Sequence, residues 1–155
     1  MNLAYPSIIF LTDYYCLLWN RFAKESLPFP EFIRCDSAKL PLRSDSISAI
    51  HAGAAMHCWP NLNESLSEIY RVLKPGGAFF ASTFFTPSIG ARGRRSGLKQ
   101  SANQQGFYLF ADEQEIYELV TKAGFSEETG SQCVVRKEGN RCAIVKAVKG
   151  RGGGS

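Results

Sequence analysis

The sequence lacks the features expected of a disulfide-stabilised, zinc-binding or membrane-spanning chain. Its five cysteines are an odd number and include no Cys-x-x-Cys pair, which argues against a disulfide framework or a zinc site. Asp13 and then Asn20–Arg21 interrupt the N-terminal apolar stretch, so no run reaches the length of a membrane span. We therefore expect a globular protein from a reducing compartment, with no metal and no membrane span.

What the sequence does contain is typical of one folded domain. The chain has 155 residues, of which 45% are hydrophobic and 12% aromatic, enough for one core but not for two. The net charge of +4 is too small to indicate nucleic acid by itself. We expect a domain over residues 1–149 and a flexible, glycine-rich tail over residues 150–155.

Strand and helix patterns alternate along the chain. Short apolar runs predict strands, and apolar residues at helical spacing predict the helices between them. The expected strands cover 7–11, 31–35, 46–51 and 78–82, the expected helices cover 14–26, 61–73 and 112–123, and a closing hairpin covers 132–136 and 142–148. This order predicts an α/β fold whose mostly parallel sheet has the antiparallel hairpin at one edge.

Local signals mark the ends of these elements. Asn61 with Glu64, and Asp112 with Glu115, predict capping boxes at two helix starts. The run Lys74–Gly77 predicts a helix stop and a turn, with a structural and not a chemical role. Residues 86–106 show no periodicity, so we expect a mobile loop there.

Polar or small residues follow three of the expected strands. They are Asp13, Asp36 and the run His51–Gly53. In open α/β sheets, ligands bind beyond the C-terminal ends of the strands. These positions are therefore the first candidates for a binding site.

Four motifs follow one another from the second expected strand onward. They read RCDSAKLPL from Arg34, SISAI from Ser46, MHCWP from Met56 and EIYRVLKPGG from Glu68. In this order they resemble the motifs of small-molecule class I S-adenosylmethionine-dependent methyltransferases. The run HAGAAMHCWP is similar to that of plant, plastid-targeted methyltransferases of unassigned substrate. The resemblance covers residues 7–148 and implies a Rossmann-like fold that transfers a methyl group from S-adenosyl-L-methionine to a small molecule, such as a quinone-like ring.

The resemblance assigns four positions to the nucleoside of the cofactor. Asp13 would accept two hydrogen bonds from the ribose diol, although its position also suits a helix N-cap. Asp36 would accept from the exocyclic amine of adenine, while the N–H of Ser37 or Ala38 faces the ring nitrogen. The structural alternative for Asp36 is an Asx-turn that ends the strand.

Three further positions belong to the methyl-transfer side of the implied site. Ala52 and Gly53 are small enough to let the backbone approach the methionine portion of the cofactor, or to form a tight strand exit. His57 would face the methyl-transfer cavity, where it could orient the acceptor or remove a proton. Its structural alternative is packing against Trp59.

The sequence departs from the family pattern at two places. The family opens with a strand and a G-x-G-x-G turn, but no glycine precedes Asp36. We therefore expect an N-terminally truncated domain that lacks the first strand and glycine-rich loop and binds the cofactor weakly by itself. Ser48 stands where the family carries an acid. An alternative function follows: a catalytically inactive isoform or fragment that retains the fold.

A third hypothesis concerns the basic segment Arg92–Lys99, which could bind nucleic acid. The segment lacks interleaved aromatic residues, so a solvated lid over the active site is favoured and nucleic acid is not expected as a partner. The family resemblance implies a chloroplast location, although the chain shows no transit peptide; otherwise we expect the cytoplasm.

Overall fold

The computed structural model describes residues 8–9, 22–26, 31–85, 108, 110–139 and 141–151. The chain divides into two units, Met1–Asp36 and Ser37–Ser155. In the first unit, β1 (Ile8–Ile9) pairs in parallel with β2 (Glu31–Phe32). Both strands lie within the runs predicted to be strands. The predicted helix over 14–26 falls largely outside the described residues, apart from a helical turn at 22–24.

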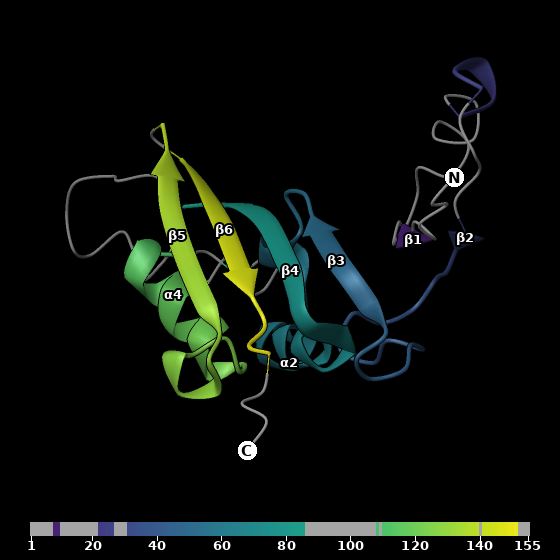
Figure 1. Cartoon of the computed structure of the whole chain (residues 1–155). Coiled ribbons are helices and arrows are strands. Elements are labelled where there is room, and N and C mark those ends of the chain that lie inside the picture. The colour runs from purple at the N-terminus through teal and green to yellow at the C-terminus, as the bar shows by residue number, and fades with distance from the viewer. Residues whose placement is uncertain are drawn as a thin grey trace. The chain divides into compact units, whose positions relative to one another are not determined.

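The second unit is built on a four-stranded sheet in the order β3-β4-β6-β5 (Figure 1). Its strands are β3 (Ile47–Ala52), β4 (Leu73–Phe84), β5 (Gln132–Glu138) and β6 (Cys142–Val148). β3 is parallel to β4, whereas β6 is antiparallel to both β4 and β5. Three of these four strands therefore run in one direction, and the predicted α/β class and closing hairpin are confirmed.

The hairpin of β5 and β6 lies at one edge of the sheet, as predicted. Within it, β5 is the edge strand, and β6 lies between β4 and β5. Its residues Ala143, Val145 and Ala147 are fully buried, as suits a strand with neighbours on both sides. The hairpin pattern in the sequence predicts that two strands pair, but it does not say which of them meets the rest of the sheet.

Helix α2 (Leu62–Val72) connects β3 to β4 and buries Leu62, Leu66 and Ile69. The capping box predicted at its start is wrong. Asn61 occupies the N-cap position, but its side chain makes no capping bond to the backbone. Its Nδ2 instead donates to Glu64 Oε2 at 2.8 Å. The ψ angle of 72° at Asn61 lies outside the extended geometry that aims a capping oxygen at the helix.

The run Lys74–Gly77 follows the end of α2, as predicted, but it lies within β4, beside an irregularity in the β3–β4 register, and does not form a separate turn before the strand. α2 ends where Leu73 becomes extended and pairs with Ile47, and the next ladder pair joins Ala78 to Ala49. Gly76 has a φ of +77°, a left-handed conformation that glycine adopts without steric cost. β4 consequently begins before the predicted residue 78.

Helix α4 (Glu113–Lys122) begins as its sequence predicts. Asp112 Oδ1 accepts a hydrogen bond from the Glu115 N–H at 2.9 Å, and Glu115 Oε2 accepts one from the Ala111 N–H. This reciprocal arrangement satisfies backbone donors that the first helical turn leaves without partners. A short helical turn, η2 (Glu127–Thr129), then leads into β5.

The helices α2 and α4 lie behind the sheet in Figure 1 and cover one of its faces. The core between them and the sheet includes Phe79 and Ala81 of β4 with Ile116 and Phe125. On the opposite face, Phe80, Phe84 and Val134 are 41%, 45% and 46% exposed. Alternation along β4 thus separates a buried face from an accessible one. The predicted loop 86–106 lies outside the described residues.

Candidate functional site

A polar contact joins the exit of β3 to β4. Ala52 ends the strand and is buried, and Gly53 and Ala54 follow it into a turn. Ala54 has a φ of +49°, and its N–H donates to Ser82 Oγ at 2.9 Å. Because β3 and β4 are parallel, this turn lies at the sheet edge where ligands bind in α/β folds. The structure therefore places Ala52 and Gly53 where the sequence predicts them.

His57 lies just beyond this exit, on the short helix η1 (Met56–Cys58). Its Nδ1 is 3.4 Å from Thr83 Oγ1, and its ring meets that of Phe84 edge-on at 5.2 Å. Burial lowers the pKa of His57 below its ordinary 6.5, so the ring is neutral at physiological pH. A neutral imidazole can accept a proton or orient an acceptor. The His57 ring thus contacts Phe84, a partner that the sequence did not indicate.

Tyr108 joins His57 to the start of α4, a link that the sequence alone did not indicate. Its backbone N–H donates to the His57 carbonyl at 2.7 Å. Its hydroxyl donates to Glu115 Oε1 at 2.9 Å. Burial and the Glu115 carboxylate raise the pKa of Tyr108 to about 12. The predicted cap at Asp112 indicated that Glu115 lies in the first turn of α4, but it did not indicate the contact of Glu115 with Tyr108.

His51 is a second histidine at the β3 exit. Its ring stacks on Phe80 with centroids 5.5 Å apart. A Cβ added at Gly53 would lie 3.2 Å from His51 Cε1, so the absence of a side chain at Gly53 leaves room for this ring. The sequence placed His51 at the end of an expected strand but gave a catalytic role only to His57.

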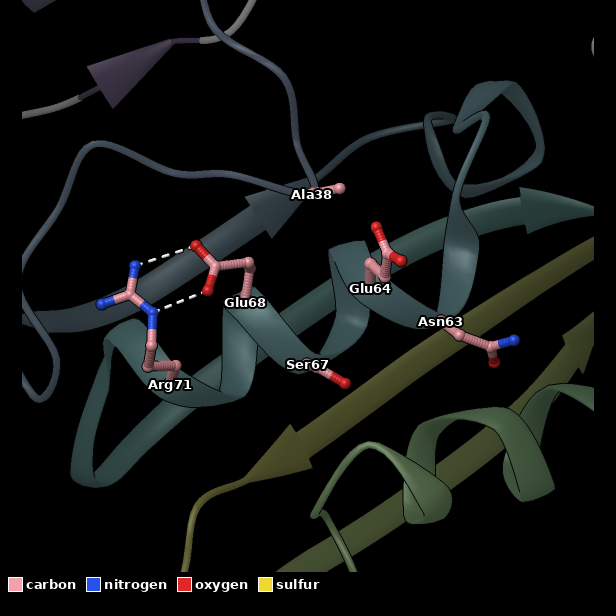
Figure 2. A pocket seen from close by; sticks show the side chains of 6 residues that line it. All are labelled: Ala38, Asn63, Glu64, Ser67, Glu68 and Arg71. Atoms are coloured by element: carbon pink, nitrogen blue, oxygen red, sulfur yellow. Dashed lines mark hydrogen bonds and ion pairs between the residues drawn. The ribbon is translucent and has the colours of Figure 1, made fainter.

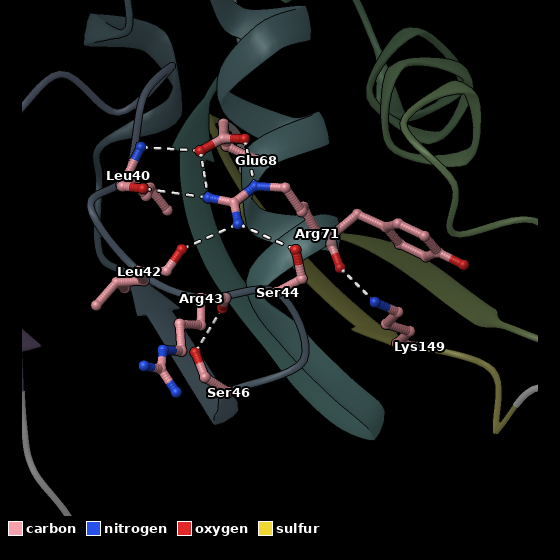
Figure 3. A network of polar contacts seen from close by, with 9 residues as sticks. Leu40, Leu42, Arg43, Ser44, Ser46, Glu68, Arg71 and Lys149 are labelled. Carbon is pink, nitrogen blue, oxygen red and sulfur yellow. Dashed lines mark hydrogen bonds and ion pairs between the residues drawn. The ribbon is translucent and has the colours of Figure 1, made fainter.

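Ser37 and Ala38 are held on the surface of α2. The Ser37 and Ser65 hydroxyl oxygens are 2.7 Å apart, and Ala38 is buried. Two residues further on, the Leu40 N–H donates to Glu68 Oε2 at 2.9 Å. The contact between Leu40 and Glu68 belongs to a larger polar network around Arg71 (Figure 3). Ser37 and Ala38 therefore form one group with α2, while Ala52, Gly53 and His57 form another at the β3 exit.

A surface hollow of about 400 Å³ borders this α2 group. It is lined by Ala38 and by the α2 side chains of Asn63, Glu64, Ser67, Glu68 and Arg71 (Figure 2). Figure 2 shows Glu68 and Arg71 turned toward each other, with Ser67 and Asn63 pointing away from them. His57 and the β3 exit are not among its lining residues, so the hollow is not the predicted methyl-transfer cavity.

The two predicted carboxylates belong to the first unit. Asp13 lies outside the described residues. Asp36 is exposed at the end of that unit. Burial and, secondarily, the charge of Asp36 raise the pKa of the neighbouring Cys35 thiol. The predicted roles of Asp13 and Asp36 toward a nucleoside thus remain predictions.

Within the part of the chain that the structure describes, no cluster of three His, Cys, Asp or Glu side chains could hold a metal ion. No helix among the same residues is long and apolar enough to cross a membrane.

Comparisons with known proteins agree with this fold. A family model described as a methyltransferase domain matches residues 13–81. Two uncharacterised chloroplastic methyltransferases of Arabidopsis thaliana are 37% and 41% identical over 112 and 100 residues, which is 65% and 61% of this chain. The chain spans only 30% and 26% of the length of these relatives.

A solved structure extends the likeness to three dimensions. The phosphoethanolamine N-methyltransferase 2 of Haemonchus contortus, in complex with S-adenosylhomocysteine, superposes with a TM-score of 0.64. The match covers 88% of this chain and 41% of that one at 14% identity, so it is evidence for the fold alone.

The fold, the order of the motifs and the family model over residues 13–81 make this chain similar to the class I S-adenosylmethionine-dependent methyltransferases. Within that class, it is similar to the two chloroplastic methyltransferases of Arabidopsis. The resemblance drawn from the motifs is confirmed.

Proposed function

We propose that residues 1–149 belong to a domain that transfers a methyl group from S-adenosyl-L-methionine to a small-molecule acceptor. The observation that carries the proposal is the β3 exit, where Gly53 and Ala54 turn without bulky side chains beside neutral His57. Similarity to named methyltransferases supports the reaction class. The acceptor would enter from the side of Phe84, whose ring is half exposed.

Small residues at the β3 exit support the binding of an extended cofactor there. Ala54 offers a backbone held in place by Ser82, and Gly53 lies beside the His51 ring, which occupies the side where a Cβ would stand. Ala52 and Gly53 would meet the methionine portion. Asp36 and the N–H of Ser37 or Ala38 would recognise adenine, and Asp13 would bind the ribose diol.

The cofactor supplies an electrophilic methyl group, so the protein mainly has to align the acceptor and receive its proton. His57 can do this at Nε2, provided that its Nδ1–H donates to Thr83 Oγ1. In the other tautomer Nδ1 accepts from Thr83, and Nε2–H then orients the acceptor as a donor. Either way, Thr83 fixes the plane of the imidazole ring.

Calorimetric titration of the chain with S-adenosylhomocysteine tests the proposal. Asp36→Ala should weaken binding by about 1–3 kcal/mol, as expected for a charge-assisted hydrogen bond. Asp13→Asn should cost less, because the amide keeps one acceptor. Equal and negligible effects in a protein that binds would contradict the site assignment. Absence of binding by the wild type would favour the inactive form that retains the fold.

Methyl transfer itself is tested with S-adenosylmethionine and a panel of aromatic and lipid-soluble acceptors, by measuring S-adenosylhomocysteine release. Turnover that requires an acceptor would support the proposal. If nucleic acid rather than a small molecule stimulated turnover, the basic segment 92–99 would become the candidate interface. That segment lies outside the described residues.

The similarity to chloroplastic relatives supports a plastid location for the encoded protein. Fractionation of plant tissue followed by detection with an antibody to residues 112–148 tests this. Recovery in the cytosolic fraction alone would contradict it.

A further inference from the structure

Three polar side chains lie three residues apart on α2, at Ser65, Glu68 and Arg71; we call them the polar row. Because residues at this spacing share one helix face, the row meets a single neighbouring segment. That segment is 37–46, which connects the end of the first unit to β3 and contains no helix or strand. The contacts follow the same chain direction in both elements. Ser37 contacts Ser65 at the start of the row, and Ser44 contacts Arg71 at its end.

The contacts of the row are mostly with the backbone of the segment. Glu68 Oε2 accepts from the Leu40 N–H at 2.9 Å. Arg71 donates from Nη2 to the Leu40 carbonyl at 3.1 Å and from Nη1 to the Leu42 carbonyl at 2.9 Å (Figure 3). Backbone groups accept or donate in fixed directions, so these bonds specify the conformation of the segment and not only its proximity.

Glu68 and Arg71 hold each other in the geometry that these contacts need. Arg71 Nε lies 2.7 Å from Glu68 Oε1, and Nη2 lies 2.8 Å from Oε2, as a bidentate pair. The Arg71 hydrogen bonds and, to a smaller extent, the Leu40 N–H lower the pKa of Glu68, while burial opposes them. The side chains of Arg71 and Glu68 are 36% and 20% exposed, respectively, so the ion pair alone adds little stability.

Ser65 anchors the other end of the row and is fully buried. Its hydroxyl meets that of Ser37 at 2.7 Å. A buried hydroxyl is costly without a partner, so this pair fixes where Ser37 and Ala38 lie on the helix. These are the residues whose backbone would meet adenine.

We propose that the polar row of α2 positions the backbone of residues 37–42 for recognition of the adenine base. The inference rests on the proposed function. Ser65, Glu68 and Arg71 are positioning residues, because they contact the segment and not the nucleoside. An irregular segment without them would sample many conformations, and a donor that has to face one ring nitrogen tolerates little displacement.

The test compares two ligands in the full chain. S-adenosylhomocysteine carries the exocyclic amine, whereas S-inosylhomocysteine carries an oxo group and a protonated ring nitrogen in its place. Wild type should bind the adenosyl ligand at least about tenfold more tightly, because the oxo ligand reverses donor and acceptor. Arg71→Lys and Glu68→Gln should reduce this ratio to about threefold or less, since one hydrogen bond is worth roughly a factor of ten.

Two controls separate positioning from general destabilisation. Glu118→Gln removes a carboxylate of α4 that accepts from Gln114 on the same helix, and it should leave the ligand ratio unchanged. The double variant Glu68→Arg with Arg71→Glu keeps an ion pair, but it places a cation where the Leu40 N–H needs an acceptor. The double variant should therefore show the same reduced ligand ratio as the single variants.

Amide hydrogen exchange without ligand gives a readout that does not depend on cofactor binding. In Arg71→Lys, residues 38–42 should exchange faster, while 143–147 in β6 stay protected. If wild type binds neither ligand, the proposed function fails and the adenine role fails with it, whereas exchange still decides whether the row orders the segment. If the variants loosen the segment but keep the wild-type ligand ratio, the positioning role is overturned and the proposed function stands.

Discussion

Lys149, which follows β6, caps the C-terminal end of α2 through the carbonyl of Tyr70. Its Nζ donates to this carbonyl at 2.8 Å and to the Leu73 carbonyl at 2.9 Å, and it lies 4.6 Å from the centre of the Tyr70 ring. A cation at a helix C-terminus satisfies carbonyls that have no partner within the helix and complements the helix dipole. Lys149 thereby holds the C-terminal end of α2, the helix that carries the polar row, against the residues that follow β6.

Lys149→Met should destabilise the second unit by about 2–4 kcal/mol, because charged hydrogen bonds to two carbonyls are lost at a largely buried position. Asp45→Asn is the matched control. It removes only the carboxylate that Lys149 contacts at 2.8 Å, on a side chain that is 54% exposed, and should change stability by less than about 1 kcal/mol. Urea denaturation followed by circular dichroism measures both. Equal effects would show that the ion pair, and not the helix cap, matters.

The turn after β3 gives a prediction about backbone strain. Ala54 has a φ of +49°, which costs a residue with a Cβ about 1–2 kcal/mol. Ala54→Val should therefore destabilise the protein by roughly 2 kcal/mol, because β-branched residues are poorly accommodated there.

Ala54→Gly is the companion variant. Relief of strain and the greater entropy of glycine in the unfolded chain oppose each other, so its stability should lie within about 1 kcal/mol of wild type. Thermal melting compares the two variants. If valine were tolerated as well as glycine, the left-handed geometry at this turn would be wrong.

The Tyr108 phenol should titrate with a pKa far above the ordinary value for a tyrosine. Its pKa is raised to about 12 by burial and by its hydrogen bond to Glu115, so it stays protonated in the native protein when ordinary phenols ionise. The difference between the 295-nm absorbance titrations of wild type and Tyr108→Phe should show one group with a midpoint near 12. A midpoint near 10 would contradict the Glu115 contact.

The same shift has a consequence for stability. The pKa of Tyr108 is higher in the folded protein than in the unfolded chain. The stabilising contribution of Tyr108 to the free energy of unfolding is therefore fully present below about pH 10, and it is lost as the pH rises through the folded-state pKa. Tyr108→Phe should therefore flatten the loss of stability between about pH 10 and 12. Glu115→Gln provides a partial control, since it removes the charge but keeps an acceptor.

His57 predicts a pH dependence of opposite sign. Burial lowers its folded-state pKa below 6.5, so the unfolded chain binds this proton more readily than the native protein does. Its contribution is present above about pH 6.5 and is lost as the pH falls through the lower folded value. His57→Gln should be less acid-sensitive than wild type in urea titrations at pH 5 and 7.5.

Activity separates the two interpretations of His57. In a protein with measurable turnover, His57→Ala should lower kcat while cofactor affinity stays within a few-fold. A collapse of affinity together with a lower melting temperature would mean that His57 serves packing against Phe84 and Thr83, and would remove it from the reaction.

Local signals were sufficient for much of the fold. Asp112 three residues before Glu115 predicted a cap because both partners of that bond lie within one helical turn. Lys74–Gly77 predicted the end of α2 because proline and glycine disfavour a helix locally. The motif EIYRVLKPGG led to the class of protein. The α/β order and the pairing of β5 with β6 were predicted from periodicity, since alternation records which side of a strand is buried.

Other features depended on residues far apart in the sequence. Nothing near Lys149 indicates that it reaches Tyr70, and nothing in the hairpin pattern places β6 between β4 and β5. The burial of His57 was set by Phe84 and Thr83, which only the parallel pairing of β3 with β4 brings beside it. Sequence patterns record local hydrogen bonds and burial periodicity, whereas these contacts arise only when distant segments pack, and packing decides pKa values and backbone positions at the site.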